Sequence, residues 1–355
     1  MRAQQSLGEV NAETPEGQLL QQIGQEQDAA KKLALMEEFD SKYASHQGAG
    51  WVWAQMQEAY LKANQPDKSL TYAEKIHQKD PNDVHAAHQG LKAAEAKNDP
   101  ALVIKWSGVT SEAARKAAAA AKPSDEDEVE NWKARVDYAK QVDTYTEYSL
   151  YATALRTQDP AQKIALVEAL RARNPESEYL PKAVPLEFSA HRQAKNNEKA
   201  LAVAEAAIEK GYPDEEMLVF VADHYMQSKK EPEKVISYSE KAVEIIESKP
   251  KPEGVAEADW TNRNNALSGL ALFMAGSTQY GEKKVKEADQ TLRKALPLVD
   301  ANDQLKAAVL FYLGLANYDM RNRKDALSFN QACSKIKSPF QAKAIQNVRL
   351  IQAGK

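Results

Sequence analysis

Apolar residues recur at helical spacing along the chain, in short segments that polar turns separate. In residues 50–81, an apolar stripe at Trp53, Met56 and Tyr60 precedes a polar turn, and a second amphipathic stretch follows it. Pro81 ends the second stretch, because proline cannot continue a helix. No segment alternates apolar and polar positions with β-branched residues, so strands are not expected. The pattern predicts a repeating unit of helix, turn, helix and stop.

Caps and helix breakers set the expected bounds of each helix. Ser124 is the expected N-cap of the longest one, since acidic residues in the first turn complement the helix dipole. The predicted helices are residues 15–25, 28–43, 50–63, 67–79, 82–97, 100–121, 124–157, 159–173, 179–195, 198–210, 214–228, 232–248, 256–280, 282–299, 302–320, 323–335 and 340–352.

The last two helix pairs carry small and aromatic residues at fixed spacings. One has Ala275-Gly276, Tyr280, Ala288 and Ala295, and the other has Leu313-Gly314, Tyr318, Ala326 and Cys333. This pattern resembles the tetratricopeptide repeat family, in which small residues sit where helices cross at about 8–10 Å. A glycine costs about 1 kcal/mol in a helix interior, so close packing is expected to offset Gly276 and Gly314.

The resemblance implies an all-α fold: a right-handed α-solenoid of antiparallel helix pairs. The best-matched units are about residues 269–302 and 307–340, and the earlier units match the motif less well, with an irregular period. Residues 340–352 are the expected C-terminal capping helix, because a solenoid must cover its last apolar face.

Composition does not change along the chain, which favours a single domain over residues 1–355. Prolines interrupt the helical pattern at 122–125 and at 249–253, and we expect bends there. Degenerate units followed by two well-matched ones also resemble bacterial exported repeat proteins.

Charge and hydropathy argue against two classes of partner. The 47 basic and 51 acidic residues leave a formal net charge of −4, which offers no attraction to nucleic acid or to an anionic membrane. The longest nearly apolar run, about residues 267–275, is too short to span a bilayer. We therefore expect a protein or peptide partner, with no nucleic acid bound and no membrane insertion.

The start of the chain bears on its compartment. Residues 3–9 are polar and lack the apolar core of a signal peptide, so either the protein is cytoplasmic or Met1 replaces a cleaved signal. The polar start and the resemblance to exported repeat proteins favour a periplasmic or secreted protein, with the cytoplasm as the alternative. Cys333 alone cannot form an internal disulfide and does not decide between the two.

Residues that could carry chemistry are few. His85 and His88 lie three apart on a predicted helix, as two metal ligands do, but no third ligand is evident, so a helix surface is the preferred interpretation. Cys333 occupies a position where the repeat needs a small buried residue, which favours packing over nucleophilic catalysis. Residues 48–50 lack the features of a phosphate loop. We expect no catalytic residues, no metal, no cofactor and no enzymatic activity.

The resemblance implies a binding groove lined by the first helix of each pair. In the last two units the groove positions fall on Phe273, Ser277, Tyr280, Phe311, Leu315 and Tyr318. These side chains are mostly aromatic or apolar and lack the Lys and Asn of a carboxylate clamp, so they resemble a groove for a hydrophobic peptide. The alternative is that residues 340–352 fold back and cover this groove.

Tyrosines gather on the longest predicted helix. Tyr145, Tyr148 and Tyr151 follow one another at steps of three, and Tyr138 precedes them on the same helix. A tyrosine has an apolar ring and a polar tip, which suits a half-exposed binding surface. Packing between helices is the alternative, and the sequence favours it.

Taken together, these patterns predict a scaffold that binds proteins or peptides in the concave face of its helix pairs. This prediction depends on analogy at the level of the fold. The alternative is a structural role, as a self-assembling protein or an accessory subunit of an envelope complex. A metal-dependent enzyme that uses His85 and His88 is a third and weaker alternative.

Overall fold

The computed structural model describes residues 11–354, and within this range every regular element is a helix. The first nine are α1 (Pro15–Gln25), α2 (Ala29–Tyr43), α3 (Ala49–Lys62), α4 (Pro66–Lys79), α5 (Val84–Lys97), α6 (Pro100–Ala118), α7 (Glu126–Arg156), α8 (Pro160–Arg173) and α9 (Leu180–Gln193). The others are α10 (Asn197–Glu209), α11 (Glu215–Ser228), α12 (Pro232–Ser248), α13 (Glu257–Gly281), α14 (Val285–Ala295), the 3₁₀ helix η1 (Leu296–Val299), α15 (Asp303–Asp319), α16 (Arg323–Ser334) and α17 (Gln341–Gln352).

These helices pack as successive antiparallel pairs, which confirms the predicted all-α fold of paired helices. The bounds of α1 and α12 agree with the prediction to the residue. Thr14 caps α1, since its hydroxyl accepts the N–H of Gly17 at 3.2 Å, and Pro232 begins α12. An Asp or Asn side chain caps many of the other helices in the same way. Asp159, for example, accepts from the N–H of Gln162 at 2.8 Å at the start of α8.

Three of the predicted helices had wrong bounds. The helix predicted for residues 100–121 ends at Ala118. The N-cap of α7 is Asp125, not Ser124, because the Asp125 carboxylate accepts the N–H of Asp127 at 3.0 Å. In place of the helix predicted for residues 282–299, α14 covers only Val285–Ala295 and η1 follows it.

Backbone geometry explains both ends of this last helix. Lys283 has a positive φ of 64°, which closes α13 and delays the start of α14 until Val285. At the other end, Pro297 has no N–H to donate, so the last turn becomes the 3₁₀ helix η1.

The chain divides into two compact units, Met1–Ala194 (unit 1) and Lys195–Lys355 (unit 2). The predicted bend at 122–125 falls in the loop between α6 and α7, and the one at 249–253 falls in the loop between α12 and α13. Neither therefore lies at the junction of the units. The single array over residues 1–355 stays a prediction.

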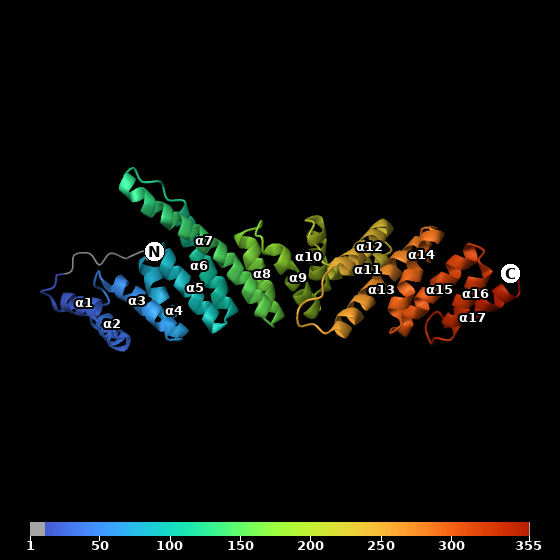
Figure 1. Ribbon diagram of the computed structural model, residues 1–355, viewed down its shortest axis with the longest axis horizontal. Coiled ribbons are helices and arrows are strands. Elements are labelled where there is room, and N and C mark those ends of the chain that lie inside the picture. Colours follow the sequence, from blue (N-terminus) through green and yellow to red (C-terminus); the bar gives the residue numbers. More distant parts are fainter. Residues whose placement is uncertain (1–10, 355) are drawn as a thin grey trace. The chain divides into compact units, whose positions relative to one another are not determined.

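In unit 1, each helix packs mainly against the helices next to it in the chain (Figure 1). One apolar core forms around Phe39, Met56 and Tyr60, and a second forms around Trp106 and Leu166. All five side chains are at most 2% exposed. Burial of one such side chain contributes about 1.5–3 kcal/mol, so these cores hold the helix pairs together.

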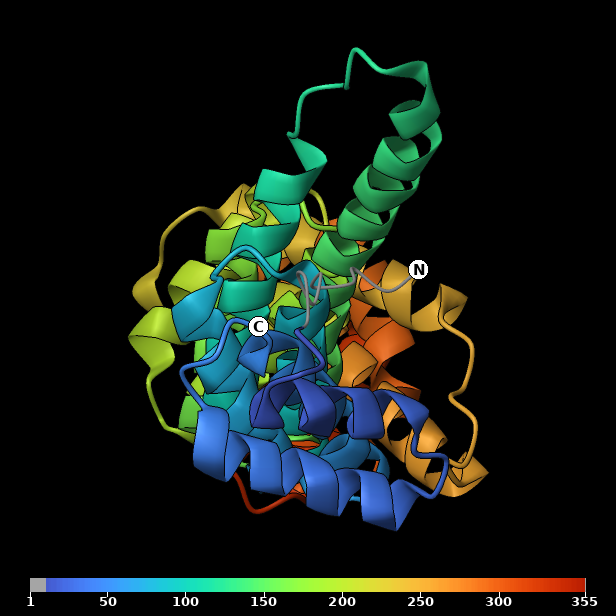
Figure 2. The same cartoon turned by 90° about the vertical axis from the view of Figure 1, so that its left-hand side faces the viewer.

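The ends of α6 and α7 form a hairpin that projects beyond the other helices of unit 1 (Figures 1 and 2). The indole N–H of Trp132 on α7 donates to the carbonyl of Ala120 in the loop at 2.9 Å. This bond ties the loop to the first part of α7.

In unit 2, glycines lie where helices cross closely, as the repeat pattern predicts. A Cβ atom on Gly276 would lie 2.6 Å from Cγ of Leu292. On Gly314 it would lie 2.3 Å from Nδ2 of Asn330, which is buried and bonded to the Ala326 carbonyl at 2.8 Å. Both distances are below van der Waals contact, so the α13–α14 and α15–α16 crossings depend on the missing side chains.

Cys333 also occupies a packed crossing. Its thiol is fully buried and donates to the carbonyl of Ala307 on the neighbouring α15 at 3.3 Å. Burial raises the pKa of the thiol to about 11, so very little thiolate exists at neutral pH. The geometry supports the predicted packing role.

We expect Cys333 to resist alkylation in the folded protein. At pH 8, iodoacetamide should leave the native protein unmodified by mass spectrometry, whereas the urea-unfolded chain should gain one adduct. Rapid modification of the folded chain would contradict both the burial and the raised pKa.

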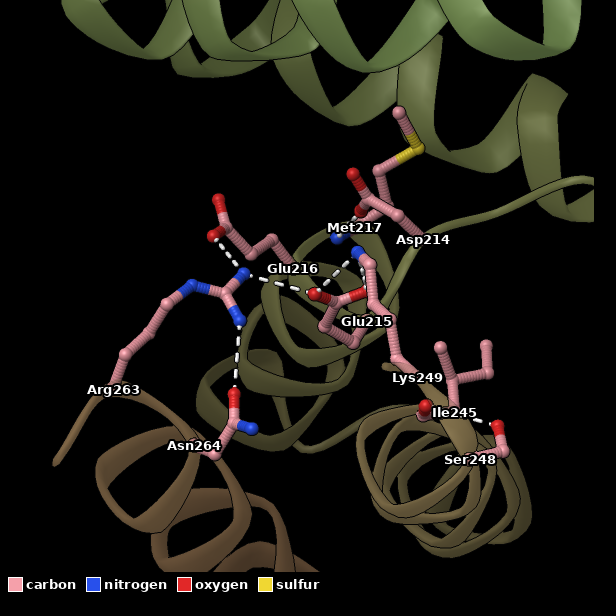
Figure 3. A network of polar contacts seen from close by, with 9 residues as sticks. All are labelled: Asp214, Glu215, Glu216, Met217, Ile245, Ser248, Lys249, Arg263 and Asn264. Atoms are coloured by element: carbon pink, nitrogen blue, oxygen red, sulfur yellow. Dashed lines mark hydrogen bonds and ion pairs between the residues drawn. The ribbon is translucent and has the colours of Figure 1, made fainter. Parts of the chain in front are cut away.

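In unit 2, a buried carboxylate forms ion pairs that hold the loop between α12 and α13. Glu215, in the first turn of α11, is 1% exposed. Its carboxylate binds Nζ of Lys249 at the end of α12 and Nη2 of Arg263 on α13, each at 2.9 Å (Figure 3). Arg263 also binds Glu216 at 2.6 Å and donates to Oδ1 of Asn264 at 3.2 Å. The network therefore joins three helices around the 249–256 loop.

Candidate functional site

The predicted groove residues of unit 2 meet around one tyrosine. The ring of Tyr312 on α15 lies 6.0 Å from that of Phe273, 5.9 Å from that of Tyr280 and 5.9 Å from that of Phe311. Leu315 packs half-buried into the same apolar cluster. The structure thus brings four of the six predicted residues together, and we call them, with Tyr312, the unit 2 aromatic cluster.

The other two predicted residues lie differently. Ser277 is 6% exposed, and its hydroxyl donates to the carbonyl of Met274 at 3.3 Å, within its own helix. Tyr318 is 44% exposed and forms none of the ring contacts of the cluster. One of the pair is therefore inside the fold and the other is on its surface.

Phe340 already packs against part of the unit 2 aromatic cluster. The ring of Phe340, the N-cap residue of α17, lies 5.0 Å from the ring of Phe311 and 6.4 Å from that of Tyr312. The phenol of Tyr280 donates to Asp319 at 2.9 Å, and burial together with this bond raises its pKa to about 12. Phe340, at the start of α17, thus packs against one end of the cluster, and covering of the groove by residues 340–352 stays a prediction.

The tyrosines of α7 belong to a longer row of rings in unit 1. Tyr145 and Tyr148 lie 6.0 Å apart between ring centroids. Tyr148 and Tyr151 both contact Tyr179, the residue before α9, at 5.8 and 5.7 Å. Tyr151 and Tyr179 stack at 22°. The ammonium of Lys182 lies 5.8 Å from the centre of the Tyr179 ring.

The row continues from α7 onto α5. The ring of His88 lies 5.1 Å from that of Tyr145 and 6.3 Å from that of Tyr138. We call the rings of Tyr138, His88, Tyr145, Tyr148, Tyr179 and Tyr151 the unit 1 aromatic row. It follows the first helices of successive pairs, α5 and α7, and ends at the start of α9.

Hydrogen bonds fix one end of the unit 1 aromatic row. The phenol of Tyr145 donates to Glu95 at 2.8 Å, and burial together with this bond raises the pKa of Tyr145. Nδ1 of His88 lies 3.1 Å from the phenol oxygen of Tyr138. Burial, with a smaller contribution from Lys92, lowers the pKa of His88 to about 4, so its ring is neutral at physiological pH.

The geometry bears on the metal alternative for His85 and His88. The His88 ring is committed to contacts with two tyrosines. Among residues 11–354, no group of three or more His, Cys, Asp or Glu side chains is placed to hold a metal ion. In the same range, no helix combines the length and the apolar character needed to cross a membrane.

Sequence reasoning missed Tyr312, Tyr179 and the contribution of His88 to the row. Tyr179 lies in the turn before α9, so no helical periodicity connects it to the tyrosines of α7. Tyr312 follows Phe311 directly, so the helical spacing that selected Phe311, Leu315 and Tyr318 passed over it, although its ring lies at the centre of the cluster. One signal was available, because alternation from the unit at 50–81 makes the predicted helices 82–97 and 124–157, which carry His88 and Tyr145, the first helices of their pairs.

Comparisons with known proteins give similarity only to solved structures. No family model matches the sequence, and no curated protein matches it. The chain is similar to the crystal structure of yeast Tom70, with a TM-score of 0.35 and 13% identity, covering 100% of this chain and 67% of that one. It is also similar to the crystal structure of the P58(IPK) TPR domain, with a TM-score of 0.25 and 12% identity, covering 96% and 98%.

Proposed function

We propose that this chain is a protein-binding scaffold and that an extended segment of its partner lies along the unit 1 aromatic row. The observation that carries the proposal is a set of ring contacts running from α5 to the start of α9, in which exposure rises to 46% at Tyr148. A continuous series of half-exposed rings offers apolar faces to a partner over several residues.

The polar tips of the row support a peptide ligand. The phenols of Tyr148 and Tyr151 form no hydrogen bond within residues 11–354, whereas those of Tyr138 and Tyr145 have partners. Two free phenols can exchange hydrogen bonds with the main chain of an extended segment. Because ring contacts already hold Tyr148 and Tyr151 in place, binding would cost little side-chain entropy.

Unit 1 is a better candidate than the predicted groove of unit 2. Phe340 already lies against Phe311, and the Tyr280 phenol already bonds to Asp319. A ligand in that groove would have to displace both contacts. Tyr318 is exposed, but it lacks the neighbouring rings that give Tyr148 a continuous surface.

Exposed tyrosines in the two units provide a matched test of this proposal. Partners would be captured with the wild-type protein, identified by mass spectrometry, and their affinities measured for Tyr148→Ala and Tyr318→Ala. We expect Tyr148→Ala to weaken binding by about 1–2 kcal/mol, as for an aromatic interface residue, and Tyr318→Ala to have little effect. The two residues are 46% and 44% exposed, so both variants should fold, as circular dichroism would check.

Two outcomes would contradict the proposal. If Tyr318→Ala weakens binding and Tyr148→Ala does not, the partner uses the surface of unit 2 that the sequence predicted. If neither variant changes the affinity of any partner, the unit 1 aromatic row serves only to pack helices.

A further inference from the structure

Unit 2 contains a groove that is separate from its aromatic cluster. The groove lies between α12, α13 and α14 and has a volume of about 610 Å³, within the range of small-ligand and peptide side-chain sites. Leu272 of α13 lines it, whereas the next residue, Phe273, turns to Tyr312 in the aromatic cluster. The two features therefore use different faces of the same helix.

One wall of the groove is acidic. Glu240, Glu244 and Glu247 follow one another at steps of four and three, which places their side chains on one face of α12. Glu240 accepts a hydrogen bond from the amide of Gln279 at 3.2 Å. Glu244 and Glu247 form no ion pair or hydrogen bond within the described part of the chain. Of the residues that the structure describes, Lys294 of α14 is the one basic residue that lines the groove.

The floor of the groove is apolar, with one polar exception. Val243, Leu272 and Leu298 line it, and Leu272 is 8% exposed. Ser268 also lines the groove and is 6% exposed, yet its hydroxyl has no hydrogen-bond partner among residues 11–354. The residue is nearly buried and its hydroxyl lines the groove without a partner, so it is available to a ligand.

The polar network of Figure 3 holds the adjoining part of α13. Asn264 lines the groove, and its Oδ1 accepts from Nη1 of Arg263 at 3.2 Å. Arg263 is in turn bound by Glu215 and Glu216 of α11. The groove wall is therefore positioned before any ligand arrives.

We propose that this groove binds a basic segment of a protein partner. A lysine or arginine of the segment pairs with Glu244 and Glu247, an apolar side chain lies on the floor between Val243 and Leu272, and a main-chain group bonds to the Ser268 hydroxyl. Three carboxylates against one ammonium make the walls complementary to positive charge. The site goes beyond the unit 1 aromatic row, with which it shares no residue.

The floor distinguishes a peptide from a free polyamine. A polyamine satisfies the carboxylates, but it leaves the apolar floor without a partner. A segment that carries both a cationic and an apolar side chain buries both kinds of surface, so the groove is better matched to a peptide.

The test uses synthetic peptides and the full-length protein. A labelled peptide of lysine, leucine and glycine is titrated with the protein by fluorescence anisotropy at low salt, beside a peptide with glutamate in place of lysine. The double variant Glu244→Gln with Glu247→Gln should bind the lysine peptide about tenfold more weakly, because two charge pairs are lost. The matched control is Glu209→Gln with Glu282→Gln, which removes the same charge from exposed positions outside the groove and should bind like wild type.

A second variant tests the opposite wall. Lys294→Gln removes the positive charge and should bind the lysine peptide several-fold more tightly than wild type. Tyr148→Ala should not change this affinity, so failure of the unit 1 proposal and failure of this one are distinguishable.

Three results would overturn the proposed site. The first is equal binding of the lysine and glutamate peptides to wild type, including no binding of either. The second is equal weakening by the groove variant and by its matched control. The third is tight binding of spermidine that depends on Glu244 and Glu247 while the lysine peptide does not bind.

Discussion

Gly90→Ala is expected to lower the free energy of unfolding of unit 1 by about 2–3 kcal/mol, as overpacking of a rigid core does. Gly90 lies on α5 against the indole of Trp106 on α6. A Cβ atom there would lie 2.5 Å from Cε3 and 2.7 Å from Cζ3 of that ring. Trp106 is 1% exposed and cannot rotate away, so α5 and α6 must move apart.

Gly24→Ala is the matched control for this prediction. Gly24 is also a helical glycine of unit 1, but a Cβ on it would have no heavy atom within 4 Å. Alanine should therefore raise stability by up to about 1 kcal/mol through helix propensity alone. Urea unfolding followed by tryptophan fluorescence measures both variants. Equal effects in the two would contradict the close α5–α6 approach.

Glu215→Gln is expected to destabilise unit 2 by about 2–3 kcal/mol at neutral pH. The substitution keeps the shape of a buried side chain but removes the charge that Lys249 and Arg263 bind. Those two side chains are 42% and 37% exposed, so they regain water and the loss is smaller than for a fully buried pair. Thermal unfolding by circular dichroism measures the difference.

The destabilisation caused by Glu215→Gln should become smaller as the pH falls. Burial by itself would raise the pKa of Glu215, but hydrogen bonds from Lys249, from its own backbone N–H and from Arg263 outweigh it and hold the pKa below its usual value of 4.5. A carboxyl whose pKa is lowered on folding contributes stability above its unfolded pKa and loses it as pH falls. The gap between wild type and Glu215→Gln should thus be constant above about pH 5 and shrink toward zero in acid.

Glu216→Gln is the control variant for Glu215→Gln. Glu216 lies in the same turn of α11 and binds the same Arg263, but it is 49% exposed. An exposed pair contributes about 0–1 kcal/mol, so this variant should lose much less stability. If the two variants lose equally, or if the Glu215→Gln gap does not shrink as the pH falls below 5, the ion pair does not stabilise the α11–α13 arrangement.

The sequence by itself determined the secondary structure and the pairing of helices. Turn residues such as Pro81 mark the ends of helices through local sterics, and apolar spacing marks their buried faces. Both signals act within a few residues, which is why the bounds of α1 and α12 could be predicted to the residue. The small residues Gly276, Gly314 and Cys333 likewise identified close crossings, because a helix that tolerates glycine in its interior needs a neighbour there.

Tertiary structure alone decided which side chains meet. Tyr179 joins Tyr148 and Tyr151 from a turn, and Phe340 reaches Phe311 from the start of α17, at separations that no helical period encodes. Glu215 meets Lys249 and Arg263 for the same reason, over 34 and 48 residues of chain. Local spacing fixes the face on which a side chain lies. The rotation and stacking of successive helices fix its neighbours, and these depend on how all the side chains at each crossing pack together.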